Sequence, residues 1–452
     1  MLPGEIQPMN TKKRILILGG GFGGLYTALE LEKVLGRRGD IDVTLISSEN
    51  FFLFTPMLHE VAASDLDITH IVSPLRKLLK RVRFFVGDVE AIDLEARKVS
   101  VSHGESHHHH ELEYDHLVLA LGAVTNFYGN KGLERTALTM KSLGDAIHLR
   151  NRLISKLEEA DFECLSDRRN ELLTFIVAGG GFAGVETIAG VNDFLRESLK
   201  FYPNLTENDL RVVLVHGGDV ILPELSAKLG RYAEKKLESR GVEIHVDKLV
   251  TKVEGKTTTL SDGTRIEAGT IVWTAGTAAH PILSTLPCAK ESGRVLADET
   301  MSVAGFDGLW ALGDCAAVPD TASGGFHPPT AQHAIRQGKV LARNLVSAID
   351  GRKARPFSFE TIGQLAAIGR RTGVAQIMGV NFSGFVAWWL WRTIYLMKLP
   401  RLEKKLRVAI DWSLDLLFSK DLVEFLTTRS DFVSHESTVP GQNVEASVVP
   451  AP

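Results

Sequence analysis

The chain has 452 residues, which is long enough for about two to three domains with complete hydrophobic cores. Hydrophobic residues make up 44% of the sequence and charged residues 23%, an ordinary globular composition. The net charge of -4 excludes a nucleic-acid-binding protein that relies on overall positive charge. The three cysteines form no C-x-x-C pair, so neither a disulfide scaffold nor a cysteine metal site is expected, and a reducing compartment fits.

Residues 1–13 are polar and have no apolar centre, so we expect a loose leader and no secretory signal peptide. No uninterrupted run of about 18 uncharged apolar residues occurs, so the sequence contains no clear membrane span, and whether residues 385–397 lie on or cross a membrane stays open.

A first glycine-rich motif follows a short apolar run at residues 15–18 and precedes a helical run from Leu25. Residues 19–24 fit G-x-G-x-x-G, with Gly19 in the tight turn, Gly21 where a pyrophosphate approaches, and Gly24 where helix and strand pack closely. Glu49 follows the next predicted strand, at the position where an acid meets a ribose hydroxyl. This order predicts a Rossmann-type dinucleotide-binding unit.

The next residues, 51–62, form an apolar segment broken by Pro56. We expect a core loop and helix that also passes the bound cofactor. Four adjacent histidines at 107–110 lie between two predicted strands, where a solvated tip is favoured over a weak metal site. The strand that begins at Leu117 ends in small residues, Ala120 and Gly122, which allow a backbone to pass close to a cofactor.

A second glycine-rich motif occupies residues 179–184, with Gly179, Gly181 and Gly184 in the same pattern. It follows a predicted strand and precedes a helix that carries Glu186 in its first turn. The acid expected after the second strand of this unit is replaced by His216. Two such motifs predict two dinucleotide-binding domains that hold a flavin and a nicotinamide face to face.

From residue 293 the chain is expected to return to the first domain. A strand at residues 309–312 ends in Gly313 and Asp314, and Asp314 can accept a hydrogen bond from the ribityl chain of a flavin. Two prolines then fix the start of a helix with Ala331 and Gln332 in its first turn.

The C-terminal region differs in composition. Residues 385–397 contain three of the six tryptophans, Trp388, Trp389 and Trp391, and six basic residues against one acid lie between 392 and 407. Aromatic rings beside Lys and Arg favour an interfacial membrane anchor over a helix pair that caps the core or forms a dimer face. Residues 432–452 are rich in Ser, Val and Pro and are predicted to be disordered.

Together, the two fingerprints, Gly313-Asp314, the Ala331-Gln332 helix and the Trp-rich basic tail resemble the type II NADH:quinone oxidoreductases over nearly the whole chain. The resemblance implies a non-proton-pumping flavoenzyme that passes a hydride from NADH to FAD and two electrons to a quinone. It further implies a peripheral protein on the cytoplasmic face of the cell membrane, with Glu186 on the nicotinamide side and Gln332 on the quinone side. Two positions depart from the family pattern: Arg336 stands where Gln is common, and His216 stands where NADH-preferring members carry an acid.

Three alternatives stay open: an NADPH-preferring enzyme, a sulfide:quinone-type reductase, and a slow-turnover flavin redox sensor. Neither the native quinone nor the oligomeric state, a homodimer included, follows from the sequence. A dithiol reductase is excluded, because residues 49–62 contain no cysteine.

The predicted fold is α/β, with two Rossmann-type domains, one for FAD and one for NAD, and a C-terminal helical membrane-anchoring region. The expected boundaries are 13–140 and 291–360 for the FAD-binding domain, 141–290 for the NAD(P)H-binding domain and 361–430 for the anchoring region. Predicted FAD-binding residues are Gly19, Gly21, Phe22, Gly23, Gly24, Glu49, Val89, Ala120, Gly122, Gly313, Asp314, Ala331 and Gln332. Predicted NAD-binding residues are Gly179, Gly181, Gly184, Glu186, His216, Ala275 and Gly276, with Glu186 and Gln332 as catalytic residues and no metal ligand.

Overall fold

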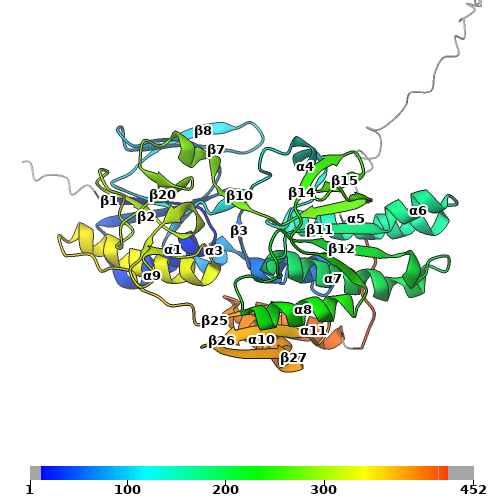
Figure 1. Cartoon of the computed structure of the whole chain (residues 1–452). Helices are drawn as coiled ribbons and strands as arrows, with labels where there is room; N and C mark the ends of the chain where they lie inside the picture. Colours follow the sequence, from blue (N-terminus) through cyan, green and yellow to red (C-terminus); the bar gives the residue numbers. More distant parts are fainter. Residues whose placement is uncertain (1–11, 416, 426–452) are drawn as a thin grey trace, which may run out of the picture.

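The structure is a computed structural model that describes residues 12–415 and 417–425; the predicted tail at 432–452 lies outside these residues. Two parallel sheets stand side by side, with a smaller antiparallel sheet and two helices beneath them (Figure 1). The α/β class and the two Rossmann sheets are confirmed.

The first sheet has the strand order β21-β9-β1-β2-β5. Its strands are β1 (Lys13–Leu18), β2 (Ile41–Ser47), β5 (Arg83–Val86), β9 (His116–Leu119) and β21 (Leu309–Ala311). Strand β21 pairs in parallel with β9, so the chain leaves this sheet and returns to it with β21. Helices α1 (Phe22–Leu35) and α9 (Ala331–Ile349) pack side by side against it, and the meander β6 (Asp88–Asp93), β7 (Lys98–His103) and β8 (His108–Glu113) lies beyond.

The second sheet has the order β13-β12-β11-β17. Its strands are β11 (Thr174–Ala178), β12 (Arg211–Val215), β13 (Val242–His245) and β17 (Thr270–Trp273). Every residue of β11 is buried, as expected for a central parallel strand covered on both faces. Around this sheet lie α4 (Lys131–Thr136), α5 (Leu143–Phe162), α6 (Ser166–Leu172), α7 (Phe182–Ser198), α8 (Ala227–Glu238) and the hairpin strands β14 (Val250–Glu254), β15 (Thr257–Leu260) and β16 (Arg265–Glu267).

Residues 141–170 are rich in charge and would be expected from the sequence to form a helical linker, but helix α5 packs into the core. Leu149, Leu153 and Leu157 are fully buried and the helix packs against α2 (Leu58–Ala62). Most of its charged residues lie on the outer face, although Arg150 and Asp161 are buried, so α5 belongs to the core.

Two connections join the Rossmann units, and they run together. Strand β10 (Ala123–Thr125) follows the first sheet, and β18 (Thr277–Ala279) follows the second. They pair in antiparallel register, with Val124 opposite Ala278.

The C-terminal region begins with the antiparallel strands β25 (Gly363–Ala367), β26 (Gly373–Ile377) and β27 (Val380–Gly384). Helix α10 (Phe385–Lys398) packs on this sheet, and α7 contacts β25 and α8 contacts β26. Helix α11 (Leu402–Leu414) follows after a short loop. Among the residues that the structure describes, no helix combines the length and apolar composition that crossing a membrane requires.

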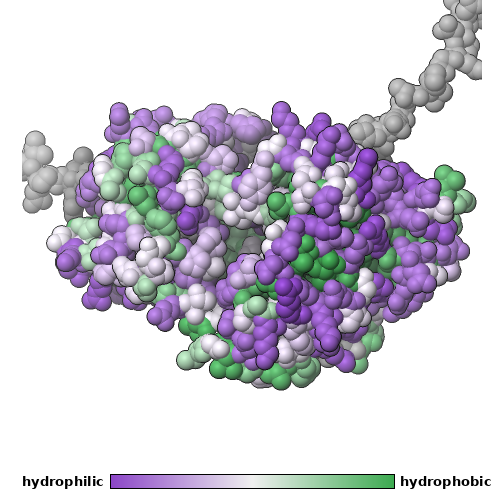
Figure 2. Space-filling view, in the orientation of Figure 1, coloured by the Kyte–Doolittle hydropathy of each residue, from purple (hydrophilic) through white to green (hydrophobic). Residues whose placement is uncertain are grey.

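The two C-terminal helices each have a buried and an exposed face. On α11, Leu402, Leu406, Ile410 and Leu414 recur every fourth residue and are all exposed, whereas Lys404, Val408 and Trp412 are buried. On α10, Trp389 is 54% exposed and Trp391 is 0% exposed. Figure 2 shows apolar surface at the lower edge of the molecule, where these helices lie in Figure 1.

The prediction that Trp388, Trp389 and Trp391 all serve as membrane-facing rings is therefore wrong for Trp391, which fills the core. Two of the six basic residues also face inward. Arg392 lies over the rings of Trp388 and Trp412, and the buried Lys404 donates a hydrogen bond to a backbone carbonyl.

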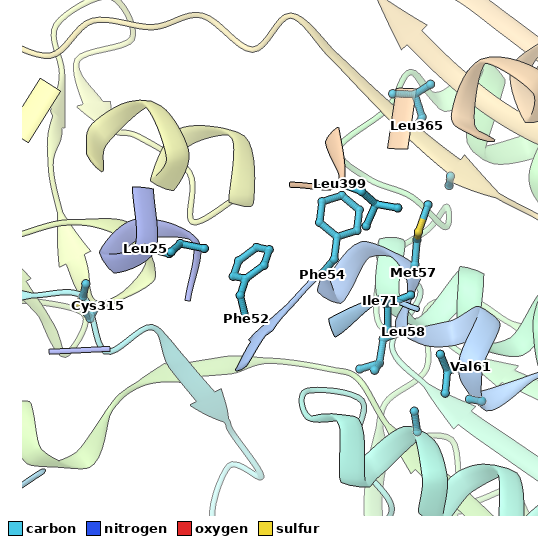
Figure 3. Close-up of a cluster of buried hydrophobic side chains, with 14 of the residues drawn as sticks. Leu25, Phe52, Phe54, Met57, Leu58, Val61, Ile71, Cys315, Leu365 and Leu399 are labelled. Atoms are coloured by element: carbon cyan, nitrogen blue, oxygen red, sulfur yellow. The ribbon is translucent and has the colours of Figure 1, made fainter. Parts of the chain in front are cut away.

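The segment at residues 51–62 is part of the core, as predicted. It comprises β3 (Phe51–Leu53), a 3₁₀ turn (Thr55–Met57) and α2. Figure 3 shows Phe52 and Phe54 in a cluster of buried apolar side chains with Leu58 and Val61 of α2, and Leu399 of the α10–α11 loop lies beside Phe54. This segment therefore links the first domain to the C-terminal region.

The remaining strands and one short helix are brief, and some of their residues, such as Leu75 and Val295, are fully buried. These elements are β4 (Val72–Pro74), α3 (Leu75–Leu78), β19 (Lys290–Glu291), β20 (Arg294–Leu296), β22 (Ala316–Ala317), β23 (Pro319–Asp320) and β24 (Gly325–Phe326).

Candidate active site

One large cavity of about 1060 Å³ lies where the two Rossmann units and the C-terminal region meet. Both glycine turns open onto it, as do the start of α9, strand β25 and the loop between α10 and α11. A space of this size at the carboxyl ends of two parallel sheets is where α/β proteins bind their ligands.

The first glycine turn has the geometry that a pyrophosphate requires. A Cβ added at Gly24 would lie 1.9 Å from the Gly19 carbonyl oxygen, so helix α1 and strand β1 can approach only without that side chain. A Cβ added at Gly21 would meet no atom within 4 Å. Helix α1 has no side-chain cap at its N-terminus, so its first backbone N–H groups are available to an anion.

The second turn repeats this arrangement. A Cβ at Gly184 would lie 1.7 Å from the Gly179 carbonyl oxygen, and α7 likewise begins without a side-chain cap. The space above Gly181 is bounded at 3.5 Å by the Glu224 carboxylate, which lines the cavity. The chain therefore offers two anion sites on facing helices.

His216 does not lie in the cavity wall. The Gly180 backbone N–H donates to His216 Nδ1 at 3.2 Å, and among the described residues Nε2 is buried without a hydrogen-bond partner. Nδ1 therefore serves as the acceptor of this bond. The ring therefore packs under the glycine turn. The carboxylate that lies beside Gly181 in the cavity wall is that of Glu224, a residue that was not predicted from the sequence.

The structure brings most of the predicted site residues together. Those that line the cavity are Gly21, Phe22, Gly23, Ala120, Gly122, Gly181, Gly184, Glu186, Gly276, Gly313, Asp314, Ala331 and Gln332. Those outside its wall are Gly19, Gly24, Glu49, Val89, Gly179, His216 and Ala275. Of these, Glu49 is exposed just beyond β2, and Val89 lies in the meander strand β6.

Asp314 and Gln332 lie on the side of the cavity formed by the first domain. Burial raises the pKa of Asp314, and the nearby ammonium of Lys141, also in the wall, opposes this shift. The Gln332 side chain donates to the Gly363 carbonyl oxygen at 3.5 Å. Arg336 Nη1 donates to the Gln332 carbonyl oxygen at 2.9 Å and its guanidinium stacks on Phe359, so this departure from the family pattern braces the start of α9.

Glu186 lies on the opposite side, buried in the wall between the second domain and the C-terminal region. Its Oε1 accepts hydrogen bonds from Trp391 Nε1 at 2.9 Å and from the Ala367 backbone N–H at 3.2 Å. Its Oε2 lies 3.7 Å from His59 Nδ1. Burial raises the pKa of Glu186 to about 8, although the two hydrogen bonds favour the carboxylate.

Several cavity residues were not predicted from the sequence. His59 of α2, Lys141 before α5, Glu224, and Lys398, Leu399 and Pro400 after α10 all line the wall. The adjacent polar pair His59-Glu60 inside an otherwise apolar segment was the available signal, since buried polar residues need partners. The C-terminal contribution had no local signal.

The histidine tip is remote from this cavity. His103 and His108 to His110 belong to the β7–β8 hairpin, which does not contribute to the wall. In the described part of the chain, no group of three or more His, Cys, Asp or Glu side chains is arranged to hold a metal ion.

Two uncapped dinucleotide turns around one cavity define a flavin- and nicotinamide-dependent oxidoreductase of the two-Rossmann-domain class. The sequence profile of the pyridine nucleotide-disulphide oxidoreductase family matches residues 13–338, and that of the NDH2 C-terminal domain matches residues 362–421.

Individual relatives agree with both profiles. The chain is 34% identical over 437 residues to a type II NADH:quinone oxidoreductase of Mycobacterium tuberculosis, covering 92% of this chain and 89% of the relative. It is 30% identical over 423 residues to a probable NADH dehydrogenase of Dictyostelium discoideum, covering 91% of each. The solved NDH2 of Plasmodium falciparum in complex with NADH shares the fold, with a TM-score of 0.84, 20% identity, and coverage of 91% of this chain and 100% of that one. The chain belongs to the type II NADH:quinone oxidoreductase family, which confirms the resemblance seen in its sequence.

The residues present fit the FAD that this family implies. The open space over Gly21, the uncapped start of α1 and the half-buried Asp314 match a pyrophosphate and a ribityl chain. The three cysteines do not contribute to the cavity wall, and burial raises the pKa of Cys315 to about 11. A sulfide:quinone-type reaction needs reactive thiols at the flavin, so that alternative lacks its chemistry here.

Proposed function

We propose that this chain is an FAD-dependent NADH:quinone oxidoreductase that does not pump protons. The observation that carries the proposal is a single cavity shared by two uncapped dinucleotide turns and reaching the α10–α11 loop, whose flanking helices expose apolar faces. NADH then enters from the second domain and the quinone from the α10–α11 side.

When bound, FAD would supply the redox chemistry, in which a hydride leaves NADH and the quinone receives the two electrons together with that proton and a second proton from water, so that NAD+ and a quinol are formed. The first glycine turn would hold its pyrophosphate, Glu49 a ribose hydroxyl and Asp314 the ribityl chain. The second glycine turn would hold the pyrophosphate of NADH. The protein's own part is orientation and the exclusion of water.

Glu186 and Gln332 have separate roles on the two sides of the cavity. A nicotinamide that gives up a hydride becomes positively charged, and an ionised Glu186 in the wall would stabilise that charge as it develops. Gln332, in the first turn of α9, would donate a hydrogen bond on the quinone side. The role of Glu186 follows from its position and its charge, and the role of Gln332 follows from its position and its amide N–H groups.

The enzymatic test is a steady-state assay with a short-chain quinone, run with NADH and NADPH in parallel. Turnover with NADH is expected; a flavin-containing protein without turnover would contradict the proposal and favour the redox sensor. His216→Glu should raise the ratio of kcat/KM for NADH over NADPH about tenfold, equal to about 1.4 kcal/mol. The reason is that a carboxylate can accept a hydrogen bond from the 2′-hydroxyl and repels the 2′-phosphate, whereas the His216 ring carries no carboxylate and packs under the glycine turn.

His216→Asn is the matched control, because it changes the side chain without adding charge. Its coenzyme ratio should stay near that of the unsubstituted chain. An unchanged ratio in His216→Glu would show that position 216 does not read the ribose.

The chain is proposed to bind the membrane surface peripherally through α10 and α11, on the cytoplasmic face of the cell membrane. The exposed stripe of α11, together with Phe385, Val386 and Trp389 of α10, is an apolar surface flanked by basic residues. A homodimer that buries the same surface is the competing arrangement.

The exposed thiol of Cys164 fits a reducing compartment.

Replacing Leu402, Leu406 and Ile410 together with Ser should weaken liposome binding at least about hundredfold, since burying each such side chain contributes about 1.5 kcal/mol or more. High salt should release the unsubstituted protein only in part, because apolar burial is not screened. Sedimentation with anionic vesicles measures both effects. The matched control replaces three apolar residues that are as exposed but remote, Phe162, Leu165 and Phe201. Equal loss of binding in both variants, or none in either, would contradict the anchor.

A further inference from the structure

Two indole N–H groups of the C-terminal helices donate hydrogen bonds to buried carboxylates that belong to α2 and α7. Trp391 of α10 donates to Glu186 at 2.9 Å. Trp412 of α11 donates to both oxygens of Glu60 at 3.1 and 3.2 Å. Because a buried indole N–H and a buried carboxylate each need a partner, these bonds tie the two helices to the wall of the cavity.

Glu186 depends on the C-terminal region for its orientation. Both donors to its Oε1, the Trp391 indole and the Ala367 backbone N–H, come from that region, although Glu186 belongs to helix α7 of the second domain. Oε2 is left to face His59. The hydrogen bonds that select one orientation of this carboxylate therefore come from outside its own domain.

The same helix α10 carries the proposed membrane face. Trp389, two residues before Trp391, points to solvent and is 54% exposed. A helix rotation that moved Trp389 would also move Trp391, because both side chains are fixed to one rigid backbone. Membrane contact and the position of Glu186 are thus linked through one element.

We propose that Trp391 is a positioning residue, through which the membrane-facing helix α10 holds the Glu186 carboxylate in the cavity wall for reaction with NADH. The proposal rests on the role given above to Glu186. It adds a residue that lies 205 positions away in the sequence and that touches neither substrate in its assigned role.

The consequence for ionisation follows from the surroundings of Glu186. The other titratable groups that face it are His59 and Glu60 of α2 and Tyr395 of α10. Burial lowers the pKa of His59 to about 3, so this ring is neutral and supplies no positive charge. The Trp391 N–H is one of two donors that favour the ionised carboxylate, and its loss would raise the pKa of Glu186 further.

The experiment follows flavin reduction by NADH in the full-length flavoprotein by anaerobic stopped-flow, as a function of pH. Trp391→Phe and Trp391→Leu both remove the donor but leave different packing. In each, the apparent pKa of the reductive step should move upward by about one unit, as expected for a lost hydrogen bond to a charged group. Phe201→Leu, at an exposed aromatic residue remote from the C-terminal helices, should leave the profile unchanged.

The Glu186→Gln background separates the inference from the function on which it rests. In Glu186→Gln the ionisation with an apparent pKa near 8 should disappear from the pH profile of flavin reduction. Adding Trp391→Phe to this variant should then leave the pH profile unchanged. An unchanged profile in both Trp391 variants, with the ionisation still lost in Glu186→Gln, would overturn the positioning role alone. An ionisation that persists in Glu186→Gln would overturn both. If Trp391→Phe fails to retain flavin, Trp391→Leu gives the same test.

Discussion

At a pH well above 8, replacing Glu186 with Gln is expected to slow flavin reduction by NADH about a hundredfold, the usual size of losing one group that stabilises transition-state charge. The carboxylate lies in the cavity wall and its pKa is raised to about 8 by burial. Below that pH the group is protonated and neutral; above it the group is ionised and stabilises the forming nicotinamide cation. The unsubstituted protein should therefore reduce its flavin faster as the pH rises through about 8, and Glu186→Gln should be slow at every pH.

Gln332→Ala is the matched variant on the other side of the cavity. It should leave reduction by NADH nearly unchanged and slow reoxidation by quinone, because Gln332 lies at the start of α9 near β25. Anaerobic stopped-flow measures the two half-reactions separately, and the flavin absorbance shows that both variants retain the cofactor. If both substitutions slow the same half-reaction, the assignment of the two sides is incorrect.

Gly24→Ala should produce a protein that is less stable and poor in flavin. The added methyl would lie 1.9 Å from the Gly19 carbonyl oxygen, so α1 must move away from β1. Overpacking of this kind costs about 1–3 kcal/mol and also displaces the N–H groups that would face the pyrophosphate. The thermal midpoint and the ratio of flavin to protein absorbance should both fall.

Gly21→Ala is the control within the same turn, and it separates folding from binding. Its backbone φ is -73°, which Ala adopts freely, and the added methyl meets no protein atom within 4 Å. Stability without flavin should stay unchanged, while FAD affinity falls because the methyl occupies the space of the pyrophosphate. Unchanged FAD affinity in Gly21→Ala would show that the pyrophosphate binds elsewhere.

The sequence predicted the parts of the site whose chemistry is local. The glycine turns, Asp314 and the start of α9 are written in short motifs whose spacing determines both conformation and position in the sheet. Their convergence also follows from the sequence, because the carboxyl ends of parallel strands meet at one edge.

The C-terminal contribution could not be predicted in the same way. Helix α10 is apolar on most of its surface, so its periodicity does not distinguish buried Trp391 from exposed Trp389. On α11 the apolar periodicity would predict that the Leu and Ile stripe packs against the core. In the structure this stripe faces outward, and the buried face contains Lys404. The partner of Trp391 lies in another domain, and no local pattern encodes such a contact.

His216 shows a different limit. The sequence placed it correctly after β12, at the position for a ribose contact. Its ring instead accepts a hydrogen bond from the Gly180 N–H. The residue type does not reveal this, because an imidazole or a carboxylate at this position can accept either from a ribose hydroxyl or from a backbone N–H.

The antiparallel pair β10–β18 has a mechanical consequence. Two separate linkers would allow the Rossmann units to move apart freely. Here the two linkers are joined by backbone hydrogen bonds between residues 123–125 and 277–279. We expect this ladder, together with the contacts of the C-terminal sheet with α7 and α8, to limit the relative motion of the two units to bending at the paired strands.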